Sequence, residues 1–272
     1  MNAQIVNQEA TITAHYAVGK NYYLMELEAK ACCSHMKPGQ FLNIRPIGSH
    51  DPLLRRPMSI HQIDKQTGRF RILYQVVGRG TAQLNQMVYG NVVEILAPLG
   101  KEFPLPLDSE QRSQTVALIA GGIGIAPLYA LAEELTEKGH TCVLFFGART
   151  SDDFGVLQGF RDVGVQIITA TEDGSDGNKG YITNGLEPLL TELGVESIYA
   201  CGPMPMLKAL QSVLQSLHIP VWFSLESHMA CGVGACLGCT VKVRKPDGGW
   251  RYALLCQEGP VIAASEVIFD EQ

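Results

Sequence analysis

The chain has 272 residues, 46% of them hydrophobic, so it is long enough to form two or three domains with buried cores. Twenty-one basic and 27 acidic residues leave a formal net charge of -6, and no cluster of Lys and Arg could neutralise a run of phosphates. We therefore expect no nucleic-acid partner.

The N-terminal residues 1–10 lack the basic flank and apolar core of a signal peptide. We expect the chain to stay in the reducing cytoplasm, where its eight cysteines do not form a disulfide framework. Residues 115–132 carry no charge over about the minimum length of a membrane span. Their internal glycines and Pro127 predict instead a buried strand, a glycine turn and a helix, and no membrane span.

The first part of the chain, to about residue 104, has the pattern of an antiparallel β-barrel. Strand-sized runs rich in β-branched and aromatic residues are separated by Gly, Pro and Asp. These runs cover residues 21–29, 40–47, 69–77 and 91–98.

Two motifs in this part are candidates for holding a phosphate-bearing cofactor. One is the sequence RPMS at residues 56–59, although by composition it is also an ordinary basic strand edge. In the other, a strand ends in Gly78-x-Gly80-Thr81 before a helix-like run, and free N–H groups at such a helix start suit a pyrophosphate. A simple glycine turn with Thr81 as N-cap explains the second motif equally well.

After a Pro-rich joint at residues 101–110, strand candidates alternate with helix-sized segments, which indicates βαβ units and a parallel sheet. The strand candidates are residues 115–120, 141–147, 165–170, 197–202 and 221–226. Cys142 lies inside one strand pattern, and Cys32 and Cys33 end another; we expect all three to be small buried residues.

Two turns of this α/β part lie where nucleotides bind, at the carboxyl ends of parallel strands. The first, GGIGIAP at residues 121–127, departs from the G-x-G-x-x-G fingerprint because Pro127 replaces the third glycine. The second is Cys201-Gly202-Pro203.

The last part, residues 226–272, holds four of the eight cysteines and too little apolar periodicity for an independent core. We therefore expect something other than hydrophobic burial to organise it. Cys231, Cys236 and Cys239 form C-x4-C-x2-C, and Cys256 follows after sixteen residues. This is the spacing of plant-type [2Fe-2S] ligation.

Glycines at 232, 234 and 238 are expected to adopt positive φ and to let backbone N–H groups turn toward the sulfurs. A structural zinc site stays open, although zinc ribbons usually present C-x2-C pairs on two separate knuckles. A Rieske centre needs two histidine ligands, and His228 alone cannot supply them.

Together the motifs resemble the ferredoxin-NADP reductase superfamily, which holds a flavin on R-x-x-S and a nicotinamide nucleotide on G-x-G-x-x-P and C-G-P. Oxygenase reductases of similar order carry a whole ferredoxin domain, for which about 47 residues are too few. The short cluster segment closely resembles the electron-transfer subunit of class B dihydroorotate dehydrogenase.

The resemblance implies a multi-domain β plus α/β fold. Its parts are an antiparallel β-barrel FAD domain at residues 1–104, a parallel-sheet α/β NAD domain at 105–225 and a small [2Fe-2S] domain at 226–272. It also implies a partner, an FMN-containing catalytic subunit that oxidises dihydroorotate to orotate in pyrimidine biosynthesis. Electrons then pass from FMN through the cluster and FAD to NAD+, in a heterotetramer with two copies of each subunit.

The site residues that the resemblance implies are placement residues. For FAD they are Arg56, Pro57, Met58, Ser59, Leu73, Tyr74, Gln75, Gly80 and Thr81. For NAD they are Gly121, Gly122, Gly124, Gly202 and Pro203, with Cys201 beside the nicotinamide. For the cluster they are Cys231, Cys236, Cys239 and Cys256.

Several points stay open at this stage. Preference for NAD over NADP depends on whether Arg149 meets a 2′-phosphate, and Glu226 is either a solvated strand-end carboxylate or a flavin neighbour. Met229, Val233 and Leu237 either contact the catalytic subunit or pack on the α/β domain. The alternative functions are the reductase component of a ferredoxin, hydrogenase or oxygenase system, and a zinc-stabilised nucleotide-binding regulator.

Overall fold

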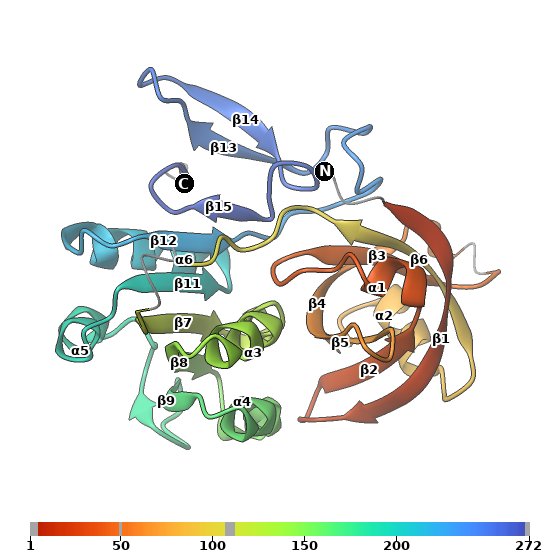
Figure 1. The fold of residues 1–272 in the computed structure, drawn as a ribbon, viewed down its shortest axis with the longest axis horizontal. Helices are drawn as coiled ribbons and strands as arrows, with labels where there is room; N and C mark the ends of the chain where they lie inside the picture. Colours follow the sequence, from red (N-terminus) through yellow and green to blue (C-terminus); the bar gives the residue numbers. More distant parts are fainter. Residues whose placement is uncertain (1–4, 49–50, 107–111, 270–272) are drawn as a thin grey trace.

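The computed structural model describes residues 5–48, 51–106 and 112–269 (Figure 1). Its first part is a closed antiparallel barrel with the strand order β1-β2-β5-β4-β3-β6. The strands are β1 (Val6–Ala17), β2 (Tyr22–Glu28), β3 (Phe41–Pro46), β4 (Arg56–Asp64), β5 (Arg69–Gln75) and β6 (Val92–Leu99). Two short helices, α1 (Lys30–Cys33) and α2 (Arg79–Asn85), cover the barrel.

Alternation of side chains across each strand fills the barrel with apolar residues. Ile12, Met25, Ile44 and Ile72 are completely buried in this core. Cys32 and Cys33 are buried with them, as the sequence predicts. A ligand can therefore bind this domain only on the outer face or at the rims of the barrel.

The second part is a seven-stranded sheet with the order β10-β9-β8-β7-β11-β12-β15. Its strands are β7 (Thr115–Gly121), β8 (Thr141–Ala148), β9 (Gln166–Thr171), β10 (Asn178–Lys179), β11 (Ser197–Cys201), β12 (Val221–Ser224) and β15 (Val261–Ala263). All neighbours are parallel except β15, which runs antiparallel to β12. The central strands are buried on both faces, which explains their continuous apolar sequences.

Helices cover both faces of the sheet. Leucines of α3 (Leu128–Glu137) and Phe160 of α4 (Gln158–Asp162) pack in one core. Leucines of α5 (Leu186–Glu192) and α6 (Met204–Val213) pack in the core on the other face. Short 3-10 turns complete this part: η1 (Gly122–Ile125), η2 (Ser151–Leu157) and η3 (Leu214–Ser216).

The uncharged residues 115–132 form β7, the turn η1 and the start of α3, so the predicted strand, glycine turn and helix are confirmed. Pro127 is the N-cap of α3, where its missing N–H is not required. Within the part of the chain that the structure describes, no helix is long and apolar enough to cross a membrane.

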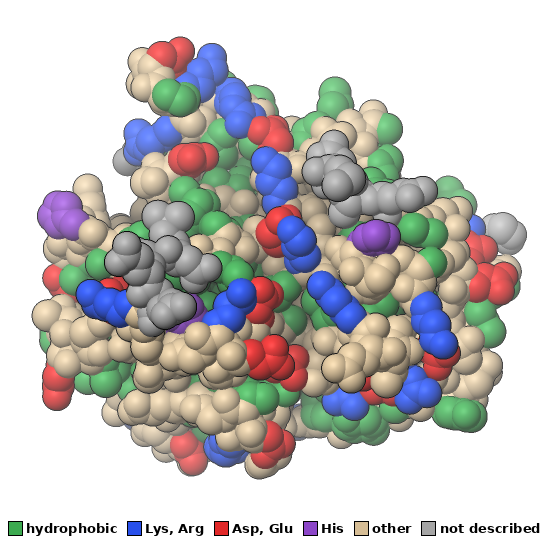
Figure 2. Space-filling view, in the orientation of Figure 1, with side chains coloured by type: hydrophobic (Ala, Val, Ile, Leu, Met, Phe, Trp, Pro, Cys, Tyr) green, Lys and Arg blue, Asp and Glu red, His purple; other side chains and the backbone are tan. Residues whose placement is uncertain are grey.

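The C-terminal part projects from the sheet as a hairpin of β13 (Thr240–Arg244) and β14 (Trp250–Leu254). The hairpin has no hydrophobic core of its own, because Val243, Ala253 and Leu255 pack in the same core as residues of β7 and β11. The expectation that hydrophobic burial does not organise this segment is therefore wrong. Figure 2 shows Lys and Arg side chains along the hairpin, while charges of both signs mix over the rest of that face.

A barrel, a parallel α/β sheet and a small C-terminal segment are the fold class that the sequence predicts, and the structure confirms it. The two large parts meet where α3 packs on β4 and η1 packs on β5.

Candidate functional site: a four-cysteine cluster site beside a nucleotide cleft

The four C-terminal cysteines are brought together by the hairpin. Because Thr240 pairs with Leu254, the residues that flank the hairpin, Cys239 and Cys256, become neighbours. The Cys256 backbone N–H donates to Cys239 Sγ at 3.4 Å. The loop from β12 to β13 then returns Cys231 and Cys236 to the same place.

Backbone N–H groups point at the sulfurs, as the sequence predicts. Those of Val233 and Cys236 both donate to Cys231 Sγ at 3.4 Å, and that of Gly234 donates to Cys256 Sγ at 3.1 Å. Gly232 and Gly234 have φ values of 72° and 81° and make this curvature possible.

The prediction for the third glycine is wrong. The positive φ after Cys236 falls on Leu237, at 57°, and Gly238 has an ordinary backbone conformation. Leu237 is the one non-glycine residue with positive φ among the described residues. Its side chain is 66% exposed, so the turn that presents Cys236 and Cys239 also directs an apolar group outward.

The thiols differ in electrostatic environment. Desolvation disfavours the thiolate of Cys231, but the N–H groups of Val233 and Cys236 outweigh it and lower the pKa of Cys231 to about 7. For Cys256, burial and the neighbouring Cys239 raise the pKa to about 12. Without a metal, the neutral thiol of Cys256 is therefore favoured at neutral pH.

The four thiols interact with one another. Cys231 interacts with Cys236, and Cys256 interacts with both Cys239 and Cys231. Among the described residues, no three His, Cys, Asp or Glu side chains converge as a single-ion site requires. Two thiolates for each of two irons is the donor set of a [2Fe-2S] cluster, and backbone N–H groups directed at sulfur suit it as well.

The two predicted flavin motifs meet on the barrel. Arg56 begins β4 and packs over Gly80 at the start of α2, where any side chain would collide with the guanidinium. Ser59 is half-buried on the same strand, opposite Phe41. An arginine beside a helix start suits a phosphate-bearing group.

Thr81 is not the N-cap that the simple-turn alternative makes it. Gly78 is the N-cap of α2, and the Thr81 hydroxyl accepts the N–H groups of Val77 and Gly78 at 3.0 and 3.2 Å. The hydroxyl is thus occupied within the turn.

The three predicted residues of β5 have different environments. Gln75 lines the cleft described below, and Leu73 is buried against the α/β part. The Tyr74 hydroxyl lies 2.8 Å from His15 Nε2, so this phenol is engaged inside the barrel domain.

A cleft of about 1020 Å³ opens at the carboxyl ends of β7, β8 and β11. It brings together six of the predicted residues: Gln75, Gly121, Gly122, Gly124, Gly202 and Pro203. The glycines are needed for close packing, because a side chain at Gly124 would collide with the Cys201 carbonyl and one at Gly121 with Met206. This is the position at which α/β sheets bind nucleotides.

Cys201 does not line the cleft. It is 1% exposed beneath the glycine loop, and burial raises the pKa of its thiol far above the ordinary value. Gly202 and Pro203, which follow it, line the cleft.

Charged residues line the cleft as well. Arg149 and Asp153 lie beyond β8, and Glu226 lies at the mouth of the cluster loop. Glu226 is an exposed residue on the wall of the cleft, and desolvation raises the pKa of its carboxyl.

Sequence reasoning missed Tyr22, Asp153, Glu172 and Tyr181 as cleft residues. Tyr22 reads as a core residue because it lies in an apolar strand, and it is indeed 1% exposed. Its hydroxyl nevertheless reaches the glycine loop at Gly122. No local pattern marks any of the four.

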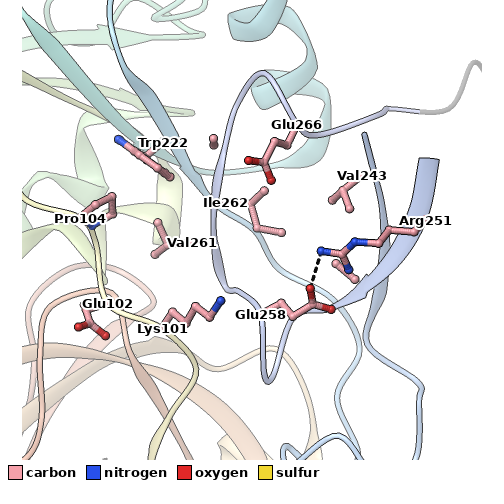
Figure 3. Close-up of a pocket in the computed structure, with 12 residues that line it drawn as sticks. Lys101, Glu102, Pro104, Trp222, Val243, Arg251, Glu258, Val261, Ile262 and Glu266 are labelled. Carbon is pink, nitrogen blue, oxygen red and sulfur yellow. Dashed lines mark ion pairs between the residues drawn. The ribbon is translucent and has the colours of Figure 1, made fainter. Parts of the chain in front are cut away.

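A second hollow, of about 310 Å³, separates the interdomain joint from the C-terminal part (Figure 3). Arg251 and Glu258 form an ion pair at 2.6 Å on one side, and Lys101 points toward it from the joint. The Lys101 N–H also donates to the Gly259 carbonyl at 2.7 Å. The hollow contains none of the predicted site residues, and its contacts anchor the cluster segment to the joint.

The fold and the site together define an NAD-linked iron-sulfur flavoprotein of the ferredoxin reductase type. A family model for the iron-sulfur cluster binding domain of dihydroorotate dehydrogenase B matches residues 226–268, and one for an oxidoreductase NAD-binding domain matches residues 118–212. The chain belongs to the family of dihydroorotate dehydrogenase B (NAD(+)) electron transfer subunits.

Relatives with that name match the chain over its whole length. The protein of Bacillus caldolyticus is 38% identical over 97% of this chain and 99% of its own. That of Fusobacterium nucleatum is 35% identical over 96% of this chain and 98% of its own. These matches favour the predicted electron-transfer subunit over the alternative reductases and over a zinc-stabilised regulator.

Two solved structures share the fold. An NADH-dependent reduced ferredoxin-NADP oxidoreductase superposes with a TM-score of 0.82 at 28% identity, covering 98% of this chain and 91% of that chain. The ferredoxin reductase of carbazole 1,9a-dioxygenase superposes with a TM-score of 0.68 at 23% identity, covering 82% of this chain and 70% of that chain. The second likeness concerns the fold alone.

Proposed function

We propose that this chain takes electrons from an FMN-containing catalytic subunit that oxidises dihydroorotate to orotate, and delivers them to NAD+. The observation that carries the proposal is that one loop and the hairpin after it bring four thiols together, directly beside a flavin-type barrel and a nucleotide cleft. Bound cofactors supply the chemistry: a cluster passes single electrons, nicotinamide takes hydride, and a flavin converts one into the other.

The residues of this chain hold those groups in order. Cys231, Cys236, Cys239 and Cys256 bind the [2Fe-2S] cluster. The segment 56–59, Leu73 to Gln75, Gly80 and Thr81 bind FAD on the outer face of the barrel. Thr81 serves by shaping the turn, and Tyr74 contributes its backbone, because both hydroxyls are already engaged.

The nucleotide lies in the cleft. Gly121, Gly122 and Gly124 let its phosphates approach the backbone, and Gly202 and Pro203 border the nicotinamide. Cys201 acts beneath them as a packing residue, since its thiol is buried. We place the domain boundaries at residues 1–104, 105–225 and 226–272.

The catalytic subunit docks on the exposed side of the cluster loop. Leu237 and Val233 are 66% and 38% exposed there, whereas Met229 is half-buried against the core of the sheet. Exposed apolar groups beside a redox centre suit a partner surface. We propose a heterotetramer with two copies of each subunit.

Leu237→Glu tests this surface. A carboxylate at the centre of an apolar contact has no partner, so we expect the two subunits to separate during co-purification. The Val88→Glu variant, at another exposed apolar residue, is the control. Unchanged affinity for the Leu237→Glu chain would rule out the surface.

The reducing cytoplasm is the expected location. All eight cysteines are free, and cluster ligation needs thiols rather than disulfides.

Reconstitution tests the function as a whole. The chain is purified without oxygen, its iron, sulfide and flavin are measured, and it is mixed with a dihydroorotate-oxidising FMN protein. NAD+ reduction by dihydroorotate is expected only in the mixture. Colourless protein without iron, or a mixture that does not reduce NAD+, would contradict the proposal.

A further inference from the structure

Asn43 of β3 contacts the cluster loop from the barrel. It is 1% exposed, and its Nδ2 donates to the Cys231 carbonyl at 3.4 Å. A side chain at Gly232 would collide with the carboxamide, so the loop backbone lies directly on it. One buried amide thus joins the barrel to the backbone of a proposed cluster ligand.

The same residue is next to the flavin motif. In the register of β3 and β4, Asn43 lies opposite Pro57, and Phe41 lies opposite Ser59. Opposite residues of antiparallel strands project to the same face. The Asn43 and Ser59 side chains therefore share a face, with diagonal neighbours about 7–8 Å apart.

The other end of the carboxamide has no partner. Asn43 Oδ1 is buried without a hydrogen bond, one of four such side-chain atoms among the described residues. Because a carbonyl can only accept, the NH2 end must face Cys231, which fixes the orientation of Oδ1. A buried oxygen requires a donor. Thiolates and sulfides only accept, so the missing donor must be an N–H or O–H group.

We propose that Asn43 is a positioning residue that fixes the separation of flavin and cluster for electron transfer, an inference that rests on the proposed function. Electron transfer between a bound flavin and a bound cluster would make or break no bond, so at given reduction potentials its rate would depend on how far apart this chain holds the two groups. Gln257 holds the loop from the other side by donating to the Val233 carbonyl at 3.1 Å. Gln257 belongs to the cluster segment, whereas Asn43 belongs to the barrel and so spans the two centres.

The test uses the full-length chain loaded with flavin and cluster, mixed rapidly with NADH without oxygen. Flavin bleaching reports the hydride step, and the visible and electron paramagnetic resonance signals of the reduced cluster report the next step. Asn43→Leu preserves the shape and removes both polar ends. We expect cluster reduction to slow about tenfold or more, as small displacements of reacting groups do, with flavin bleaching unchanged.

Asn43→Asp is the second variant, since it retains the oxygen and replaces the donor that faces Cys231; we expect the same slowing. Asn85→Leu is the matched control, because Asn85 at the end of α2 also has a buried unpartnered oxygen. Both of its rates should match those of the parent chain.

A parent chain whose flavin bleaches without a cluster signal refutes the proposed function. If the parent relays electrons and both Asn43 variants do so equally fast, the positioning role is overturned. It is also overturned if both variants merely lose iron.

Discussion

The cluster loop and the nucleotide cleft, although both are ligand sites, are built on opposite principles. Three of the four thiols lie within nine residues, and one hairpin adds the fourth. The cleft collects its lining from β2, the ends of β5, β7, β8 and β11, and Glu226 in the loop after β12. The cluster loop is local in sequence, so it tolerates little change in its own residues. The cleft is assembled from distant segments, so it depends on the packing beneath it.

The largest effect is expected for Cys239→Ser. Removal of one of four thiolates should abolish the cluster and electron transfer to or from the partner. NADH oxidation with ferricyanide, which draws on the flavin, should continue. Iron and sulfide analysis is the measurement, and Cys142→Ala, at a thiol buried in β8, is the control that should keep its iron.

The glycines of the loop provide the second test. Gly234→Ala forces a side chain into positive φ and against the Gln257 carboxamide, so we expect most of the iron to be lost. Gly238→Ala, four residues away, has ordinary φ and nothing closer than 3.6 Å, and it should retain the cluster. Equal iron contents in the two variants would contradict this account of the loop.

Gly124→Ala tests how far the nucleotide cleft depends on the packing beneath it. The new methyl group meets the Cys201 carbonyl and displaces the glycine loop. We expect KM for NADH to rise about tenfold or more and unfolding to become easier by about 1–3 kcal/mol. Steady-state kinetics and urea unfolding measure both, and iron content should not change.

The last prediction concerns stability alone and is a pH dependence that arises from His61. This residue of β4 lies 2.8 Å through Nδ1 from the carbonyl of Ala126 in the glycine loop, and its ring stacks on Tyr129. Burial lowers the pKa of His61 to about 4, below its ordinary 6.5. The unfolded chain binds a proton first as the pH falls, so stability present above pH 6.5 is lost toward pH 4, by about 3 kcal/mol.

Urea unfolding between pH 7 and pH 4.5 measures this loss. His61→Asn should flatten the curve over that range, because asparagine does not titrate. An equally steep curve in the variant would assign the pH dependence to other groups.

Chemistry that is local in the chain was predictable. The cysteine spacing, the glycine-proline turn and the C-G-P turn each carry their function within a few residues, and period-two and period-3.6 patterns separate barrel from sheet. The quoted strand runs omitted β1 and β4. The first alternates polar residues with few large apolar ones, and the second contains the RPMS motif, whose proline argues against a strand.

Other features had no signal in the chain. Leu237 has the positive φ expected of Gly238, although residue preference disfavours a leucine there. Tyr22 and Asp153 reached the cleft through the packing of barrel against sheet.

The sequence by itself determined which groups this protein can hold, because thiol number and spacing and glycine turns are properties of a few consecutive residues. Only the tertiary structure decided how those groups face one another. Asn43 against Cys231, His61 against Ala126 and Glu226 in the cleft are contacts between segments far apart in the chain, and they form through burial, which no local pattern records.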